Sequence, residues 1–150
     1  MADSVALTDR TARFALPYLF AGQAQREFYL NESLARIDAL LHAVVQSEQA
    51  QPPGSPTTGQ AFLIAASATG VWAGRGGQIA AWDGQQWTFI EPRAGMRVYE
   101  NVSRTVLRYG TAWERPMAVA NPQSGPIVDA EARAAIGQII DALRKQGLLA

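Results

Sequence analysis

Residues 79–89 read Ile79-Ala80-Ala81-Trp82-Asp83-Gly84-Gln85-Gln86-Trp87-Thr88-Phe89, with an aromatic residue, a glycine turn and a second aromatic residue. Residues 106–113 repeat this pattern, with a turn one residue shorter, as Val106-Leu107-Arg108-Tyr109-Gly110-Thr111-Ala112-Trp113. Both turns contain residues that tolerate positive φ, and apolar residues flank them, which is typical of β-hairpins. Aromatic residues on the two arms can pair across the strands. The two stretches therefore predict two hairpins of a small antiparallel β module.

Other short apolar segments around these hairpins also favour strands. Residues 62–66 read as a buried strand, residues 71–73 as a short strand, and residues 96–100 alternate as a half-buried strand. Turn residues separate these segments. Together they predict a small antiparallel sheet or a partly open barrel between residues 61 and 115.

Before the β module, residues 23–49 favour one long helix, because they lack proline and glycine. Its apolar residues alternate four and three apart, as in a heptad seam: Leu30, Leu34, Ile37, Leu41 and Val44. Two interpretations stay open. The helix packs on the core of its own domain, or it forms a short parallel coiled coil in a homo-oligomer. A proline-rich linker, residues 51–60, ends the helix in either case.

The last helix is predicted by clear signals at both ends. Asp129 is a good N-cap, and Glu131 lies in the first turn, where the helix dipole favours an acid. Gly147 fits the left-handed position after the helix, so that Leu148 packs back on Leu143 in a Schellman motif. Its apolar face consists of Ala132, Ile136, Ile139, Ile140 and Leu143. This helix docks on its own module, on a neighbouring subunit or on another protein.

The predicted fold class is therefore α+β, with an N-terminal helix, a proline linker, a small β module with aromatic hairpins and a C-terminal helix. The expected segments are 1–50, containing an oligomerisation helix, the linker 51–60, the β module 61–115, a second linker 116–128 and the helix 129–150.

Composition excludes several classes of function. The 150 residues carry 13 basic and 13 acidic side chains, scattered along the chain, so we expect no nucleic-acid partner. The chain has no cysteine, which excludes disulfides and thiolate chemistry. Neither a signal peptide nor an apolar run long enough for a membrane span is visible. We expect synthesis in a cytoplasm and no membrane insertion.

Candidate catalytic groups are few. His42 is the single histidine, and although Asp38 lies four residues before it, two ligands do not make a catalytic metal site. Glu91, Glu100 and Glu114 offer carboxylates for glycoside hydrolysis, but each lies beside a turn or a proline, where solvated acids are common. Residues 74–77 lack the ending of a phosphate-binding loop. We expect no enzymatic activity, no metal and no cofactor.

The four tryptophans have two interpretations. Small β domains need large aromatic residues in the core, and most of the tryptophans are expected there. Alternatively, an exposed tryptophan stacks on sugar rings. Trp72 is the best candidate for exposure because glycines surround it, and Arg75 and Trp82 complete a candidate ligand-binding set.

Three stretches of the chain together resemble a family of domains of unknown function that occur in tail and tail-fibre proteins of phages, prophages and gene transfer agents, largely of alphaproteobacteria. The first runs from Leu16-Pro17-Tyr18 through Gly22-Gln23-Ala24-Gln25-Arg26-Glu27 to Asn31-Glu32 and Asp38. The second runs from Pro52-Pro53 through Ala68-Thr69-Gly70 and Trp72-Ala73-Gly74 to Trp82, Trp87 and Pro92. The third is Tyr109-Gly110-Thr111-Ala112-Trp113, and residues 129–148 are similar to an ending found in the same proteins.

This resemblance implies a virion component, located in a tail or fibre, that acts in assembly or host attachment as a homotrimer with other tail proteins as partners. It supplies no catalytic residues. Cell-surface polysaccharide is the alternative partner, with the chain acting as a carbohydrate-binding module. The polar residues between Gln23 and Glu32 are expected to have a structural role, within or between subunits.

Overall fold

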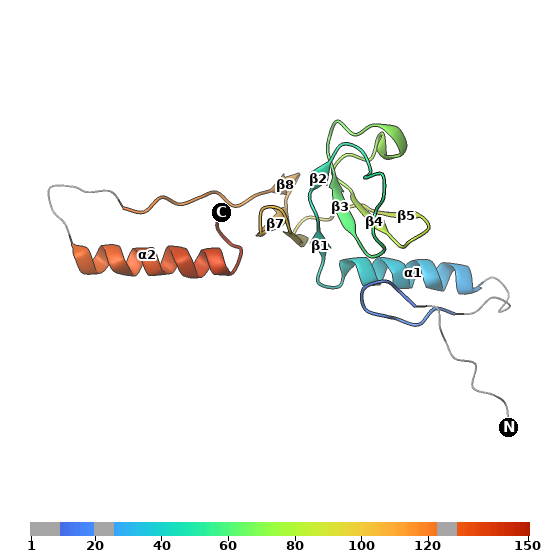
Figure 1. The fold of residues 1–150 in the computed structure, drawn as a ribbon, viewed down its shortest axis with the longest axis horizontal. Helices are drawn as coiled ribbons and strands as arrows, with labels where there is room; N and C mark the ends of the chain where they lie inside the picture. Colours follow the sequence, from blue (N-terminus) through green and yellow to red (C-terminus); the bar gives the residue numbers. More distant parts are fainter. Residues whose placement is uncertain (1–9, 20–25, 123–128) are drawn as a thin grey trace, which may run out of the picture. The chain divides into compact units, whose positions relative to one another are not determined.

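The structure, a computed structural model, describes residues 10–19, 26–122 and 129–150, and it confirms the predicted α+β fold. Helices α1 (Arg26–Leu40) and α2 (Ala130–Lys145) precede and follow two small open sheets (Figure 1). The chain divides into two compact units, one ending at Pro92 and the other beginning at Arg93. This boundary falls inside the expected β module of residues 61–115, so the division into units differs from the expected segments.

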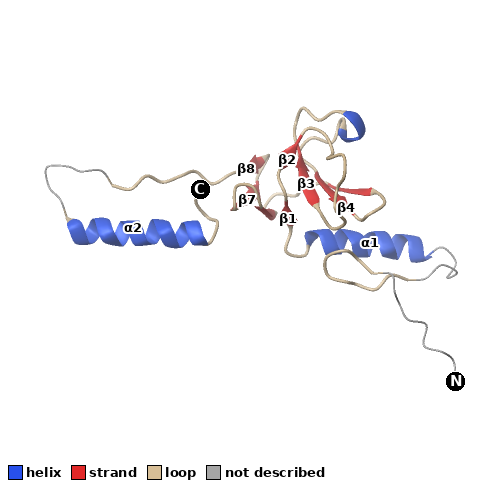
Figure 2. Cartoon of the chain, viewed as in Figure 1, coloured by secondary structure: helices blue, strands red, loops and turns tan. Residues whose placement is uncertain are grey.

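The first unit is built around a sheet in the order β2-β3-β4-β5 (Figure 2). Its strands are β2 (Glu48–Gln49), β3 (Ala61–Ile64), β4 (Ile79–Trp82) and β5 (Trp87–Ile90). Strands β2 and β3 are parallel, and the other neighbours are antiparallel. Trp82 lies directly opposite Trp87, which confirms the first predicted hairpin and its aromatic pair.

The two faces of this sheet carry different side chains, because successive residues of a strand point to opposite faces. Phe62, Ile64 and Ala80 lie on one face and form a buried core with Trp72. The opposite face carries the buried Leu63 and Ile79 and the small residues Ala61 and Ala81. The two alanines line a pocket together with residues of α1.

Helix α1 ends nine residues earlier than predicted, at Leu40 instead of Gln49. His42 follows with a φ of 50°, and the chain then forms β1 (Val44–Val45) and β2. Val44 and Val45 fit the helical period of the residues before them, but they form a strand, in which Val45 is fully buried. Both side chains are β-branched, which favours strands. The prediction of helix for residues 41–49 is wrong, and its residues 23–25 lie outside the described part.

Residues 71–73 do not form the expected strand. Gly70–Trp72 is a short 3₁₀ helix, η1, and the backbone N–H of Ala73 donates to the Gly70 carbonyl at 3.1 Å. This turn brings the Trp72 side chain into the core of the first unit, where it is completely buried.

In the second unit, β6 (Arg97–Glu100), β7 (Thr105–Tyr109) and β8 (Trp113–Glu114) follow one another as antiparallel neighbours. Exposed and buried residues alternate along β6, as predicted. Tyr109 lies opposite Trp113, with ring centroids 5.1 Å apart at 66°. The second predicted hairpin and its aromatic pair are therefore confirmed.

Both predicted ends of α2 are also confirmed. The Asp129 carboxylate accepts a hydrogen bond from the Ala132 N–H at 2.9 Å. Gly147 has a φ of 68°, and the N–H of Leu148 donates to the Leu143 carbonyl at 2.9 Å, the long hydrogen bond of a Schellman motif. An added Cβ at Gly147 would lie 3.2 Å from the Arg104 carbonyl oxygen, so glycine also suits the close approach there.

Candidate functional site

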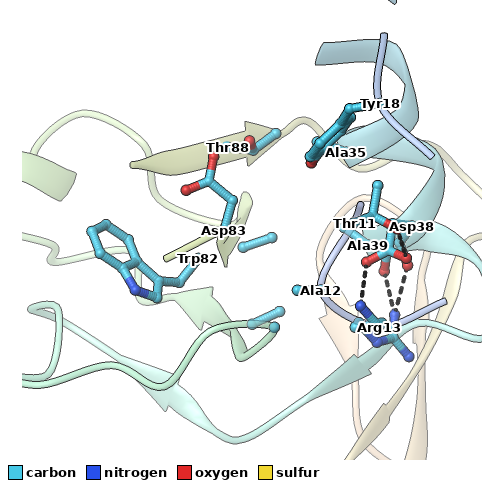
Figure 3. A pocket seen from close by; sticks show the side chains of 13 residues that line it. Thr11, Ala12, Arg13, Tyr18, Ala35, Asp38, Ala39, Trp82, Asp83 and Thr88 are labelled. Atoms are coloured by element: carbon cyan, nitrogen blue, oxygen red, sulfur yellow. Dashed lines mark hydrogen bonds between the residues drawn. The ribbon is translucent and has the colours of Figure 1, made fainter. Parts of the chain in front are cut away.

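A small pocket lies in the first unit, where the N-terminal segment, α1 and the β4–β5 hairpin meet (Figure 3). Thr11, Arg13 and Tyr18 line it from the N-terminal segment, Asp38 from α1 and Asp83 from the end of β4. The rest of the lining is mainly alanine. The chemistry of the pocket therefore depends on these five polar side chains and on Thr88 of β5.

Asp38 holds the N-terminal segment on α1. Its carboxylate, which is buried, accepts hydrogen bonds from the Thr11 hydroxyl at 2.6 Å and from the backbone N–H groups of Arg13 at 2.9 Å and Phe14 at 2.7 Å. Hydrogen bonds to a charged acceptor are stronger than those between neutral groups. Asp38 is thus fully engaged in holding two distant parts of the chain together.

Arg13 explains why α1 ends where it does. Its guanidinium donates to the carbonyl oxygens of Asp38 and Ala39, both at 3.0 Å, and of His42 at 2.7 Å. These carbonyls lack partners inside a helix that ends at Leu40, and a cation is favoured at that end of the helix dipole. A residue far away in the sequence therefore caps the helix.

Asn31 makes a second connection between the same two elements. Its side-chain oxygen accepts from the Leu19 N–H at 2.8 Å, and its side-chain nitrogen donates to the Leu19 carbonyl at 3.0 Å. The side-chain amide thus satisfies both backbone groups of one residue. The expected structural role of Asn31 is found within the chain.

Tyr18 and Asp83 supply the other polar groups of the pocket. Burial, the negative charge of Asp83 and that of Asp38, in this order, raise the pKa of the Tyr18 phenol, which stays a hydrogen-bond donor at neutral pH. The Asp83 carboxylate accepts from the N–H groups of Gln85 at 2.7 Å and Gln86 at 2.8 Å in the hairpin turn. Both carboxylates of the pocket thus bind backbone N–H groups.

The aromatic residues of the first unit form a connected row on the other face of the sheet. Trp72 contacts Trp87 edge-on with ring centroids 5.2 Å apart, and Trp87 contacts Trp82 at 5.0 Å. Phe62 packs against both Trp72 and Trp87 at 6.1 Å. The expectation that Trp72 is exposed is wrong, because η1 turns its indole into this row, where no part of it reaches solvent.

The other two predicted ligand-binding residues remain accessible. Arg75 is exposed, and its guanidinium carbon lies 3.9 Å from the centroid of the Phe89 ring, in a cation–π contact. Trp82 is half-buried, as are Trp87 and Phe89. The prediction missed Phe89 and Trp87 as members of this surface, although they pair with Ala80 and Trp82 across the hairpin and so share their face.

Two of the three candidate glycosidase carboxylates form ion pairs with arginines of the second unit. Glu114 lies 3.1 Å from Arg108, and the buried Glu100 lies 2.8 Å from Arg115. Burial acts to raise the pKa of Glu100, but hydrogen bonds from Arg115 and Ser103 and the charge of Arg115 lower it overall. The third, Glu91, is an exposed residue of the first unit.

His42 lies in the turn after α1, with its ring tilted at 47° against Phe14, 6.1 Å away. The neighbouring carboxylate, Asp38, is occupied by the N-terminal segment, so the considered pairing of these two residues around a metal lacks a free acid. Within residues 10–19, 26–122 and 129–150, no group of three side chains from histidine, aspartate and glutamate is close enough together to hold a metal ion.

The predicted oligomer-interface residues do not all lie on one helix. Leu30, Ile37 and Leu41 are 49%, 52% and 42% exposed, and Leu34 is half-buried. Leu41 lies in the turn directly after α1, and Val44 belongs to β1. The apolar stripe, called the stripe of α1 below, is therefore shorter than predicted: it consists of Leu30, Leu34 and Ile37 on the helix and Leu41 in the turn directly after it.

Comparison with known proteins gives one family. The model of the family described as "Protein of unknown function (DUF2793)" matches residues 30–114, which is more than half of the chain. No curated protein matches the sequence. Neither helix of the described residues has the length and apolar content needed to cross a bilayer.

Proposed function

The chain belongs to the DUF2793 family, and from this premise we propose that it is a non-enzymatic structural component of a phage or gene-transfer-agent tail or fibre. It assembles there as a homo-oligomer and acts in tail assembly or host attachment. The resemblance described above favours a trimer. Its partners are further copies of itself and other virion proteins.

The observation that carries this proposal is the apolar stripe of α1. Leu30, Ile37 and Leu41 expose between 42% and 52% of their surface, and they follow one another at the spacing of a helix–helix seam. Large apolar side chains that are contiguous and exposed mark interaction sites more often than scattered ones do. The side of α1 next to this stripe is occupied, since Asp38 and Asn31 hold the N-terminal segment there.

The proposal that the protein is not an enzyme is supported by the contacts of four carboxylates. Asp38 and Asp83 bind backbone N–H groups, and Glu100 and Glu114 bind arginines. A general acid or base needs a proton-exchanging atom free to reach a substrate. These four carboxylates instead stabilise turns, strands and the attachment of α1.

The oligomer is tested by light scattering behind a sizing column. At low micromolar concentration we expect a mass about three times the 16.2 kDa of the chain. Ile37→Asp places a charge in the stripe and is expected to reduce the mass to that of one chain, since burying an unpaired charge is costly. Ile37 is 52% exposed, so the substitution leaves the fold of the single chain intact.

Arg36→Asp is the matched control, because it introduces the same residue next to the stripe. Arg36 is exposed and forms an i,i+4 ion pair with Glu32 on the surface, an interaction of about 0.5 kcal/mol. The mass of the Arg36→Asp variant should equal that of the unchanged protein. A monomer before any substitution, or an unchanged mass for Ile37→Asp, would contradict assembly through α1.

A second candidate function is binding of cell-surface polysaccharide, and it is favoured by the accessible part of the aromatic row. Trp82, Trp87 and Phe89 lie on one face of the hairpin, and Arg75 lies over Phe89. Aromatic faces stack on the apolar faces of sugar rings, and a guanidinium donates to hydroxyl or acidic groups. This candidate site differs from the predicted ligand-binding set, because it contains Trp87 and Phe89 and lacks the buried Trp72.

Calorimetric titration against a panel of bacterial surface polysaccharides tests this candidate. Trp82→Ala is expected to weaken binding at least about fivefold, because the loss of one stacked ring costs about 1–3 kcal/mol. Trp113→Ala removes a half-buried tryptophan from the second unit and should leave the affinity unchanged. Equal affinities for both variants would exclude the hairpin surface as the binding site.

A further inference from the structure

Helix α2 carries an exposed apolar stripe of its own. Ile136, Ile139 and Leu143 are 43%, 59% and 36% exposed, and Ala132 extends the stripe by one turn. The four residues are four, three and four positions apart, which places them along one line of the helix. The stripe therefore has the spacing of a seam that packs against another helix.

The parts of α2 that its own unit covers lie beside this stripe. Ile140 is 4% exposed, and Arg133 and Gly137 are half-buried. Arg144 donates a hydrogen bond to the Val119 carbonyl at 3.3 Å, which connects the helix to the extended segment before it. The contacts of α2 with its own unit thus leave the line of Ile136, Ile139 and Leu143 uncovered.

Small residues border the open side of the stripe, and charges are absent from it. Ala135 and Ala142 are exposed and lie next to the isoleucines, so a second helix can approach closely. The charged residues of α2 lie elsewhere on its surface: Glu131, Arg133, Asp141, Arg144 and Lys145. An apolar helix of the same kind fits this surface without bringing an unpaired charge into the contact.

The charges at the two ends of α2 indicate which helix packs against its stripe. The first turn contains Glu131 after the capping Asp129, and the last turn contains Arg144 and Lys145. Two copies of α2 in antiparallel orientation bring the acidic end of each next to the basic end of the other, twice, and their dipoles oppose each other. Helix α1 has no basic residue in its last turn and lacks this complementarity.

We propose that α2 is a self-association helix, and that its stripe of Ala132, Ile136, Ile139 and Leu143 pairs in antiparallel orientation with α2 of a second copy of the chain. In this pair Ile136 of each copy packs against Ile139 of the other, and Glu131 lies near Lys145. The contact is two-fold and self-complementary. It does not depend on the virion role proposed above.

A single pair of 16-residue helices buries less surface than a stable dimer interface of about 1,200–2,000 Å². The pairing is therefore reversible, and it joins chains or α1 oligomers only as the protein concentration rises. For this reason the test traps the contact covalently. The protein suits such a test because it contains no cysteine, so that every disulfide comes from introduced residues.

The test uses two single variants of the full chain, Ala135→Cys and Ala142→Cys, oxidised separately and as an equal mixture. In an antiparallel pair position 135 of one copy lies beside position 142 of the other, on the same flank of the seam, whereas in a parallel pair positions 135 and 142 of different copies lie at different levels along the helices. The two positions are about 10 Å apart along the helix. We expect a disulfide-linked heterodimer in the mixture and at least fivefold less dimer from either variant alone.

Adding Ile139→Asp to both variants should abolish this heterodimer, while Gln138→Asp, on the neighbouring exposed position, should leave it unchanged. Dimers formed equally well by each variant alone would overturn the antiparallel pairing. Absence of any dimer, at concentrations where light scattering shows the chains to be associated, would overturn self-association through α2. Because only α2 positions are cross-linked, either result is independent of assembly through α1.

Discussion

Replacing Trp72 by alanine is expected to lower the free energy of unfolding by about 3–5 kcal/mol, the usual cost of truncating a buried aromatic residue. Trp72 is completely buried, and its ring contacts Phe62 and Trp87. Truncation leaves a cavity at the buried end of the aromatic row, which the rigid strands β3 to β5 are unable to fill. Urea unfolding followed by circular dichroism measures the change.

Trp72→Phe serves as the matched variant. The indole nitrogen of Trp72 is buried without a hydrogen-bond partner, so phenylalanine gives up no hydrogen bond and only part of the packing. We expect a loss of about 1–2 kcal/mol for this variant. If Trp72→Ala unfolded at the same urea concentration as the unchanged protein, the side chain would have to lie on the surface, as the alternative interpretation of the sequence has it.

The elements that were predicted correctly are those whose signals lie close together in the sequence. The β4–β5 and β7–β8 hairpins each have their turn and their aromatic pair within a few residues. The same holds for α2, since Asp129 caps the residues that follow it and Gly147 ends the helix at the next turn. In these segments local conformational preference and tertiary packing agree.

The incorrect predictions depend on contacts between distant residues. Helix α1 ends at Leu40 because Arg13 binds carbonyls 25 to 29 positions further along the chain. No periodicity around residue 40 contains this information. Trp72 is buried because the loop after β3 folds back over the sheet, although the surrounding glycines favour an exposed loop by composition.

The pocket was not predicted at all, because its members come from four separate segments. Asp38 was weighed as a partner of His42, whereas its carboxylate binds the N-terminal segment instead. Of the candidate ligand-binding residues, Arg75 and Trp82 lie on the accessible hairpin surface, and their neighbours Trp87 and Phe89 follow from the strand register. Strand register is readable in sequence only after the hairpin turn has been placed correctly.

The second large effect is expected for Asp38→Ala, which removes the acceptor shared by Thr11, Arg13 and Phe14. Each hydrogen bond to a charged group contributes roughly 1.5–3 kcal/mol, and bonds to one acceptor are not additive, so we expect a loss of about 3–5 kcal/mol in the free energy of unfolding. The N-terminal segment loses its main attachment to α1. Amide hydrogen exchange should therefore speed up at Arg13 and Phe14 before it changes in β3 to β5.

Two variants separate this attachment from a general effect of charge on α1. Glu32→Ala removes an exposed carboxylate from the same helix, one that pairs with Arg36 on the surface, and should cost less than about 0.5 kcal/mol. Thr11→Val removes one of the three donors and should cost about 1–2 kcal/mol on its own. It should cost less in the Asp38→Ala background, because there the acceptor is already absent and the substitution removes the bond that the hydroxyl accepts from the Leu16 N–H at 3.0 Å. Fully additive losses for the two substitutions would mean that Thr11 and Asp38 stabilise the protein independently. The distance of 2.6 Å between their oxygens argues for strong coupling, since a buried hydroxyl and a buried carboxylate are each costly without the other.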